Sequence, residues 1–432
     1  MWSFIICVLT CAIFILIILV KPSVKIGEKS FDTYFLVPLI GGICLVLFKF
    51  VSFEDLKIGF LTSASSNPIK VLVLFFAMSL ISIYLDETGF FEYLAGVTVK
   101  KAKSSQIKLF VIFYVMVSVL TVFTSNDIVI LTFTPFICKF CKAGKIDATP
   151  YIVSEFVGAN TWSMLFVIGN PTNIYLCSSV GIEFLEYFLV MALPTFLAGT
   201  VSFFVLFLIF RKSLNVPISC NESECELKEK ALAIIGLVHL ALCTITLSVS
   251  NFLRVEMWII SVGFVVSLFV FVLVYRLCKK QKPTILFKSV KRLPFSLAPT
   301  VIGMFVVVLA FKNNGTTTFI SNFFGESFIA LKYGVSSTLF SNVMNNIPMS
   351  VFFSQILQPL SGEILKKAVY STVIGSNLGA LLSPMGALAG IMFTSVLARH
   401  GEKFGFLDFI KYGFFITAVS LSFAILGLEI VL

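Results

Sequence analysis

Residues 106–142 read QIKLFVIFYVMVSVLTVFTSNDIVILTFTPFICKFCK, and this stretch decides the fold. The polar cluster Thr124-Ser125-Asn126-Asp127 interrupts an otherwise apolar run in its middle. Inside a membrane, backbone can leave the helix only where it lines a cavity or is buried in protein. We therefore predict a hairpin that enters the membrane, returns on the same side and holds a binding site at its tip.

The rest of the chain has the composition of a membrane protein. Of its 432 residues, 58% are hydrophobic and 12% are charged, whereas soluble proteins carry about 25% charged residues. This excludes a disordered chain, a disulfide-rich secreted domain and a cytosolic enzyme. We predict an all-α polytopic protein of the cell (inner or plasma) membrane with about 10 transmembrane helices, since each long apolar run can cross a bilayer. The predicted crossings are 3–20, 34–50, 69–85, 151–180, 184–210, 229–249, 256–275, 295–311, 371–397 and 409–431.

The distribution of Lys and Arg predicts the orientation. If 106–142 and a second broken stretch, 335–358, are both hairpins, one side of the membrane holds 22 Lys and Arg and the other holds seven. Cytoplasmic loops carry the excess of basic residues, so we expect both termini outside. The same rule explains the net charge of +10 without a nucleic-acid partner.

An internal repeat becomes visible when the polar breaks are aligned. MSLISIYLDETG at 78–89 matches MFVVVLAFKNNG at 304–315, and each is followed by a broken hairpin and then by a helix with a Gly-x-Asn break. Inverted repeats with interrupted helices indicate a secondary transporter whose site lies near the midplane. We predict N-terminal helices at 1–68, a first inverted repeat at 69–210, linkers with two connecting helices at 211–294 and a second repeat at 295–432.

Asp127 is the most informative candidate in the first hairpin. An acid in the middle of a bilayer costs about 2.5–3.5 kcal/mol on insertion scales and is a functional candidate by default. It could bind a cation or take up a proton, or it could serve only as a helix N-cap. Glu155 is a candidate proton relay that ranks below Asp127.

The other candidates are amides, hydroxyls and helix-breaking residues at the remaining breaks. Their oxygens suit a small cation or a polyhydroxylated solute, although an ordinary loop at 168–173 would also explain part of the pattern. The predicted substrate or ion ligands are Ser125, Asn126, Asp127, Asn160, Asn170, Thr172, Asn173, Asn342, Asn345, Asn346 and Asn377. The predicted unwound backbone comprises Gly158, Gly169, Pro171, Pro348, Gly375, Gly379, Pro384 and Gly386.

Cofactors and metals are not expected. The sequence has no Walker-type phosphate loop, which argues against an ATP-driven pump within this chain. It holds only two histidines, and its cysteines are scattered along the chain. This pattern does not suggest a structural zinc site, which needs a closed set of four ligands. No catalytic residues are assigned, and the coupling ion would be H⁺ or Na⁺.

Several motifs resemble those of bacterial arsenite permeases. These are Leu85-Asp86-Glu87-Thr88-Gly89-Phe90-Phe91-Glu92-Tyr93, the Asn126-Asp127 hairpin ending in Thr134-Pro135, Asn345-Asn346-Ile347-Pro348 and Ser383-Pro384-Met385-Gly386. The chain resembles the arsenite permease branch of the ion transporter superfamily, which also includes citrate, dicarboxylate and sodium–proton transporters. It departs from that branch at Gly375-Ser376-Asn377-Leu378-Gly379, which lacks the acid and the lysine found there.

The resemblance implies a secondary active transporter that exports arsenite or antimonite by exchange with protons. Coupled transport of a di- or tricarboxylate or an inorganic anion, and sodium–proton exchange, remain open alternatives. A membrane sensor that moves nothing is disfavoured, because linkers of about 20 residues fall far short of the roughly 50 that the smallest domains need. The family implies a homodimer, and an external ATPase subunit is a further candidate partner besides the substrate and the lipid bilayer.

Overall fold

The computed structural model describes residues 2–20, 23–26, 29–61, 67–102, 105–215, 227, 229–325 and 327–432. Within them the regular secondary structure is helical except for one short antiparallel hairpin, β1 (Ser23–Ile26) and β2 (Lys29–Asp32). The cysteines Cys220 and Cys225 of the polar linker lie outside the described residues.

The helices of the first part of the chain are α1 (Trp2–Val20), α2 (Leu36–Leu47), α3 (Phe53–Leu61), α4 (Pro68–Glu87), α5 (Phe90–Ala102), α6 (Gln106–Phe123), α7 (Asn126–Gly144), α8 (Thr149–Trp162), the 3₁₀ turn η1 (Val167–Gly169), α9 (Pro171–Val180), α10 (Phe184–Phe210) and η2 (Ser213–Asn215). Those of the second part are α11 (Lys230–Ser248), α12 (Ser250–Leu253), α13 (Met257–Cys278), α14 (Thr284–Lys291), α15 (Leu297–Asn313), α16 (Thr316–Phe324), α17 (Ile329–Met344), α18 (Asn346–Leu357), α19 (Gly362–Gly379), α20 (Leu388–His400) and α21 (Phe406–Val431).

Six of the described helices are long and apolar enough to cross a membrane, namely α4, α6, α10, α11, α13 and α21. A seventh span is possible if α15 and α16, which are bent by 74° at their junction, count as one. The lipid-facing character is clear in α13, where only 22% of the apolar window is buried inside the protein. The apolar helices confirm the prediction of an all-α polytopic membrane protein, with the small β-hairpin as an addition that the apolar pattern did not indicate.

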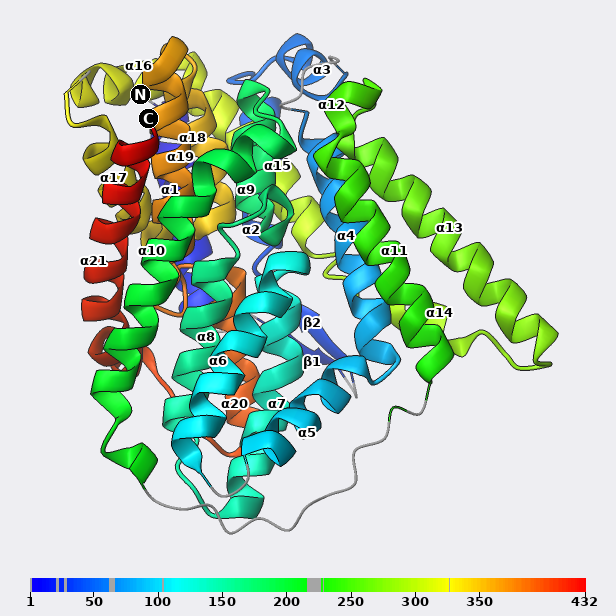
Figure 1. Cartoon of the computed structure of the whole chain (residues 1–432). Helices are drawn as coiled ribbons and strands as arrows, with labels where there is room; N and C mark the ends of the chain where they lie inside the picture. Colours follow the sequence, from blue (N-terminus) through cyan, green and yellow to red (C-terminus); the bar gives the residue numbers. More distant parts are fainter. Residues whose placement is uncertain are drawn as a thin grey trace.

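The same order of elements occurs twice. In the first half a long helix (α4) is followed by a short one (α5), a helical pair with a sharp break (α6 and α7), an interrupted pair (α8 and α9) and a long final helix (α10). The second half repeats this order with α15, α16, α17 and α18, α19 and α20, and α21. The inverted relation between the halves stays a prediction. Both chain termini lie at the same end of the molecule (Figure 1), as the predicted topology requires.

Two glycines at matching positions turn the chain at the start of each half. Gly89 joins α4 to α5 and Gly315 joins α15 to α16, and both have a φ of +80°. Only glycine adopts this conformation without a steric cost to a Cβ atom. The amphipathic helices α5 and α16 that follow were not predicted from the sequence, because each is too short and too polar to resemble a crossing.

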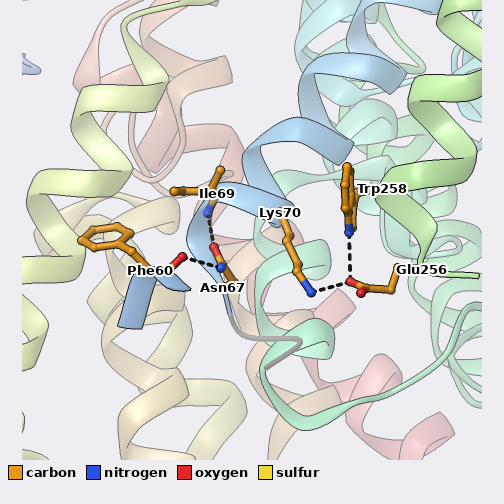
Figure 2. A network of polar contacts seen from close by, with 6 residues as sticks. All are labelled: Phe60, Asn67, Ile69, Lys70, Glu256 and Trp258. Carbon is orange, nitrogen blue, oxygen red and sulfur yellow. Dashed lines mark hydrogen bonds and ion pairs between the residues drawn. The ribbon is translucent and has the colours of Figure 1, made fainter. Parts of the chain in front are cut away.

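A polar network anchors the start of α4 (Figure 2). Asn67 caps the helix by accepting a 2.9 Å hydrogen bond from the Ile69 amide, and its own side-chain amide donates to the Phe60 carbonyl at 2.7 Å. One turn later, Lys70 forms a 2.7 Å ion pair with Glu256, which also accepts from the Trp258 indole. These contacts connect α3, α4 and the start of α13 at one end of the molecule.

Candidate functional site

Four helices begin in the interior of the protein and run away from one another. α7 and α20 pack together and occupy the lower half of Figure 1, whereas α9 and α18 pack together in the upper half. Their first residues are Asn126, Leu388, Pro171 and Asn346. A helix N-terminus presents unpaired N–H groups and the positive end of the helix dipole. The interior between these four N-termini therefore favours an anion or the oxygen atoms of a neutral solute.

The tip of the first hairpin is bonded to α8. Helix α6 ends at Phe123 and α7 begins at Asn126, so the break falls within the predicted polar cluster. The Asn126 side chain donates to Oδ1 of Asn160 at 3.0 Å and accepts from the backbone amide of Asp127 at 2.9 Å. Asn160 in turn donates to the Phe156 carbonyl of its own helix. Both amides are buried and paired.

Asn377 in α19 connects the second half of the chain to the first. Its Oδ1 lies 2.8 Å from both the Ser163 hydroxyl and Nδ2 of Asn170. Its Nδ2 donates to Oδ1 of Asn173 at 2.7 Å and to the Val373 carbonyl at 2.8 Å. One amide group thus uses two acceptor and two donor positions, which is its full capacity.

A second branch of the network joins α17 to the end of α19. Asn342 donates to the Gly379 carbonyl at 2.8 Å and accepts from the Ser383 hydroxyl at 2.5 Å. Ser383 belongs to the non-helical segment 380–387 between α19 and α20. Because Gly379 lies two residues after Asn377, both branches converge on the C-terminal end of α19.

The tip of the second hairpin is bonded to the same non-helical segment. Asn345 has a φ of +71° and a ψ of +151°, and it caps α18 by accepting from the Ile347 amide. Its side-chain amide donates to the Met385 carbonyl at 3.0 Å. The backbone amide of Asn346 donates to the Gly386 carbonyl at 3.1 Å. The predicted residues of both halves are therefore brought into one region of hydrogen-bonded side chains.

Most of the predicted side-chain amides are hydrogen-bonded to one another or to neighbouring groups, whereas a smaller set of buried oxygens has no hydrogen-bond partner among the described residues. Asp127 lies in the first turn of α7 with 7% of its surface exposed. Four buried side-chain oxygens have no hydrogen-bond partner among the described residues in this region: those of Ser125, Thr161, Asn346 and Ser376. Unsatisfied buried polar atoms are costly, so these positions are candidates for pairing with a polar substrate. The paired amides fix one another's positions.

The structure corrects the predicted positions of unwound backbone. Gly158 and Gly375 lie inside α8 and α19, and the chain leaves the helix only after Trp162 and Gly379. Pro348 sits in the first turn of α18, where the missing N–H is not needed. Gly169 lies in a 3₁₀ turn, Pro171 begins α9, and Pro384 and Gly386 lie in the non-helical segment.

Close packing explains why the two glycines are helical. A Cβ atom on Gly375 would collide with the Ser337 hydroxyl and with the Gly334 carbonyl of α17, and one on Gly158 would lie 3.3 Å from the Tyr114 ring. A glycine in a helix can mark such a close approach as well as a break, and the sequence does not distinguish the two.

One residue of the network, Ser163, was missed in the sequence, whereas Ser383 belongs to a motif that the sequence singled out. The Ser163 hydroxyl lies 2.8 Å from the Asn160 carbonyl and 2.8 Å from Asn377 Oδ1, so it links Asn160, which is bonded to the first hairpin tip, to Asn377. Ser383 fills the corresponding place beside Asn342. Ser163 follows Asn160 by three residues and so shares its helix face, which was the available signal.

A solvent-facing hollow of about 310 Å³ lies at the opposite end of α9 from the network. It is lined by Lys70, Ser178, Glu183 and Glu256 among others. Ser178 and Asn173 are five residues apart, or about 7.5 Å along the helix axis. The hollow is thus separate from the amide network, although α9 reaches both.

Known membrane proteins are similar to this chain in sequence. The sequence profile described as "Citrate transporter" matches residues 14–362. The putative arsenical pump membrane protein of Bacillus subtilis is 23% identical over 417 residues, covering 89% of this chain and 91% of its own. The arsenical pump membrane protein of Escherichia coli is 26% identical over 357 residues, covering 79% and 82%.

A solved structure shares the fold. The YdaH transporter of Alcanivorax borkumensis superposes with a TM-score of 0.54 over 99% of this chain and 97% of its own, at 13% identity. These matches confirm the resemblance that the motifs indicated, and each of the four is described as a transporter or a pump protein.

Proposed function

The chain belongs to the citrate transporter family, and we propose that it exports arsenite or antimonite in exchange for protons. It is a multi-pass membrane transporter and not an enzyme. The substrate, the coupling ion and the residues that bind them are our proposal. The relatives named arsenical pump membrane proteins, which align over most of this chain, support the substrate.

The observation that carries the proposal is the neutral, oxygen-rich network beside a single carboxyl group. Amides and hydroxyls bond one another around the ends of α8 and α19, and no Lys or Arg side chain takes part in the described hydrogen bonds there. Arsenite at neutral pH is an uncharged trihydroxide. Its hydroxyl groups can donate to Asn346 Oδ1 and to Asp127, and its oxygens can accept from helix N-termini.

Asp127 is proposed to carry the coupling proton. It lies in the first turn of α7, directly after Asn126 of the network, so protonation would change both the charge and the hydrogen-bonding pattern of the site. A site that binds a proton and a neutral solute in alternation gives antiport.

The experiment uses a bacterial host that lacks its own arsenite pump. Expression of the wild-type chain should raise the arsenite concentration that stops growth, and Asp127→Asn should reduce tolerance to that of the empty vector. Asp408→Asn is the matched control, because Asp408 also lies in the first turn of a helix but bonds only locally, to the Gly405 amide. Equal tolerance for wild type and Asp127→Asn, at equal amounts in the membrane, would refute the assignment.

A second candidate is coupled transport of a di- or tricarboxylate, favoured by the family profile and by the four helix N-termini that could bind carboxylate groups. Uptake of labelled citrate and succinate into sealed vesicles, with and without a sodium gradient, separates the two. Sodium-driven accumulation of either acid, together with no arsenite movement, would favour this candidate. Sodium-dependent proton movement without either solute would instead indicate sodium–proton exchange.

Two partners also belong to the proposal. A homodimer should appear as a cross-linked species of twice the chain mass in native membranes. An external ATPase subunit, if one acts on this chain, should make export from vesicles depend on ATP as well as on the proton gradient.

A further inference from the structure

Glu155 is a carboxyl group that the proposed site does not use. It is the seventh residue of α8, and its side chain is completely buried. Oε2 accepts a 3.0 Å hydrogen bond from the Thr134 hydroxyl of α7. Oε1 has no hydrogen-bond partner among the described residues.

No cation compensates this carboxyl group. The ion pairs of the described chain join Lys and Arg to Asp86, Glu87, Glu186, Glu229, Glu256 and Glu429, and none includes Glu155. A buried carboxylate without a cation loses far more solvation free energy than one hydroxyl donor returns. This environment therefore favours the neutral form of Glu155, and the proton is assigned to Oε1 because Oε2 accepts from Thr134.

The neighbouring titratable groups do not change this conclusion. On α7 the Cys138 thiol interacts electrostatically with Glu155 and with Glu402, which lies just beyond α20. On α8 itself, Tyr151 donates its hydroxyl proton to Gln106. At the end of α20, the His400 ring is bonded to the Val396 carbonyl. None of these is a cation that contacts the Glu155 carboxyl group.

Glu155 lies between Asp127 and the end of α7. Thr134 follows Asp127 by seven residues, which places it on the same face of α7 about 10 Å further along the axis. Pro135 has no N–H, so the carbonyl of Leu131 lacks its helical donor on the intervening turn. The Thr134 hydroxyl and the Glu155 carboxyl group bonded to it therefore lie along α7 between Asp127 and Gly144.

We propose that Glu155 is a second proton-binding residue of the transport cycle, and this rests on the proposed proton exchange. A proton taken up by Asp127 passes through water to an ionised Glu155, forming one O–H bond as another breaks. Glu155 then releases its proton toward the face at which α7 ends. The neutral Glu155 of this structure is the state after uptake and before release.

The transport test separates net coupling from exchange. In vesicles containing purified protein, Glu155→Gln should lower arsenite transport driven by a proton gradient by about 100-fold, since positioned acid–base groups contribute about 10²–10⁴ to proton-transfer rates. The rate of arsenite-for-arsenite exchange at equal pH, which needs no net proton release, should differ from the wild-type rate by less than about twofold. Glu186→Gln is the control, because Glu186 is ion-paired with Lys366; it should leave both modes intact. Wild-type proton-driven rates in Glu155→Gln would overturn the proposal.

A spectroscopic test does not depend on the substrate. The infrared spectrum of the purified wild type should contain a protonated-carboxyl C=O band that Glu155→Gln lacks. Thr134→Val should keep this band and move it to higher frequency, because the C=O oxygen loses its hydrogen bond. If the Gln variant does not fold, the Thr134→Val shift decides alone, and an unchanged band overturns the proposal. A wild type that moves no arsenite but shows these bands would refute the proposed substrate and leave the proton site standing.

Discussion

Asn377 is the side chain whose removal should most weaken the contact between the two halves. In Asn377→Ala the Ser163 hydroxyl keeps an acceptor, because the Asn160 carbonyl lies 2.8 Å away. The Asn170 amide and the Asn173 oxygen lose the partners that hold them at 2.8 Å and 2.7 Å. Each stranded buried group costs about 1–3 kcal/mol, so the expected loss in free energy of unfolding is about 2–6 kcal/mol.

The assay is reversible unfolding in mixed detergent micelles, with helical content as the signal. Asn322→Ala is the matched control, since Asn322 is an exposed residue of α16 and surface changes stay within about 0.5 kcal/mol. Asn377→Asp separates the two roles of the amide, because it keeps acceptor atoms and loses the donor to Asn173. If Asn377→Ala unfolds with the same free energy as Asn322→Ala, the amide network does not join the halves as described.

Three further changes test the local structure and the topology. Asn67→Ala should destabilise the start of α4 by about 1 kcal/mol in the same unfolding assay, and Asn67→Asp, which keeps the acceptor for the Ile69 amide, should recover most of the loss. Gly375→Ala should cost about 1–3 kcal/mol by overpacking against α17, whereas Gly263→Ala, whose Cβ would meet nothing within 4 Å, should be neutral or stabilising. In a chain cleared of cysteines, Ala143→Cys should resist an impermeant thiol reagent added outside cells and the exposed Glu363→Cys should react; the reverse pattern would remove the inverted-repeat interpretation.

The helical breaks at the two hairpin tips were predictable from the polar clusters in long apolar runs. Inside a membrane such a cluster indicates backbone that leaves the helix where it lines a cavity or is buried in protein. At Asn126 and Asn345 the side chains prefer to accept bonds from a helix N-terminus, so local chemistry and burial agree. The short elements α3, α5, α14 and α16 were not predicted, since each has 8 to 13 residues and depends on packing against longer helices. Tertiary contacts of this kind leave no periodic signal.

In the candidate site, too, the sequence predicts which residues come together, whereas their hydrogen-bond partners depend on packing. That Asn160, Asn170, Asn173 and Asn377 would meet follows from their places at matching breaks of two repeats. That they would pair with one another could not be inferred, because each amide can accept and donate and the choice depends on distances of less than an ångström. The pairing changes their role. An amide with all its positions occupied shapes a cavity, and binding then falls to the groups left over. Among the described residues of this region those are the unpaired oxygens of Ser125, Thr161, Asn346 and Ser376, and the buried carboxyl group of Asp127. If these side chains bind the substrate, they supply hydrogen-bond acceptors and hydroxyls, while the four helix N-termini supply N–H donors. A solute whose O–H groups both donate and accept would use both kinds of partner, whereas one that has only anionic oxygens would use the donors alone.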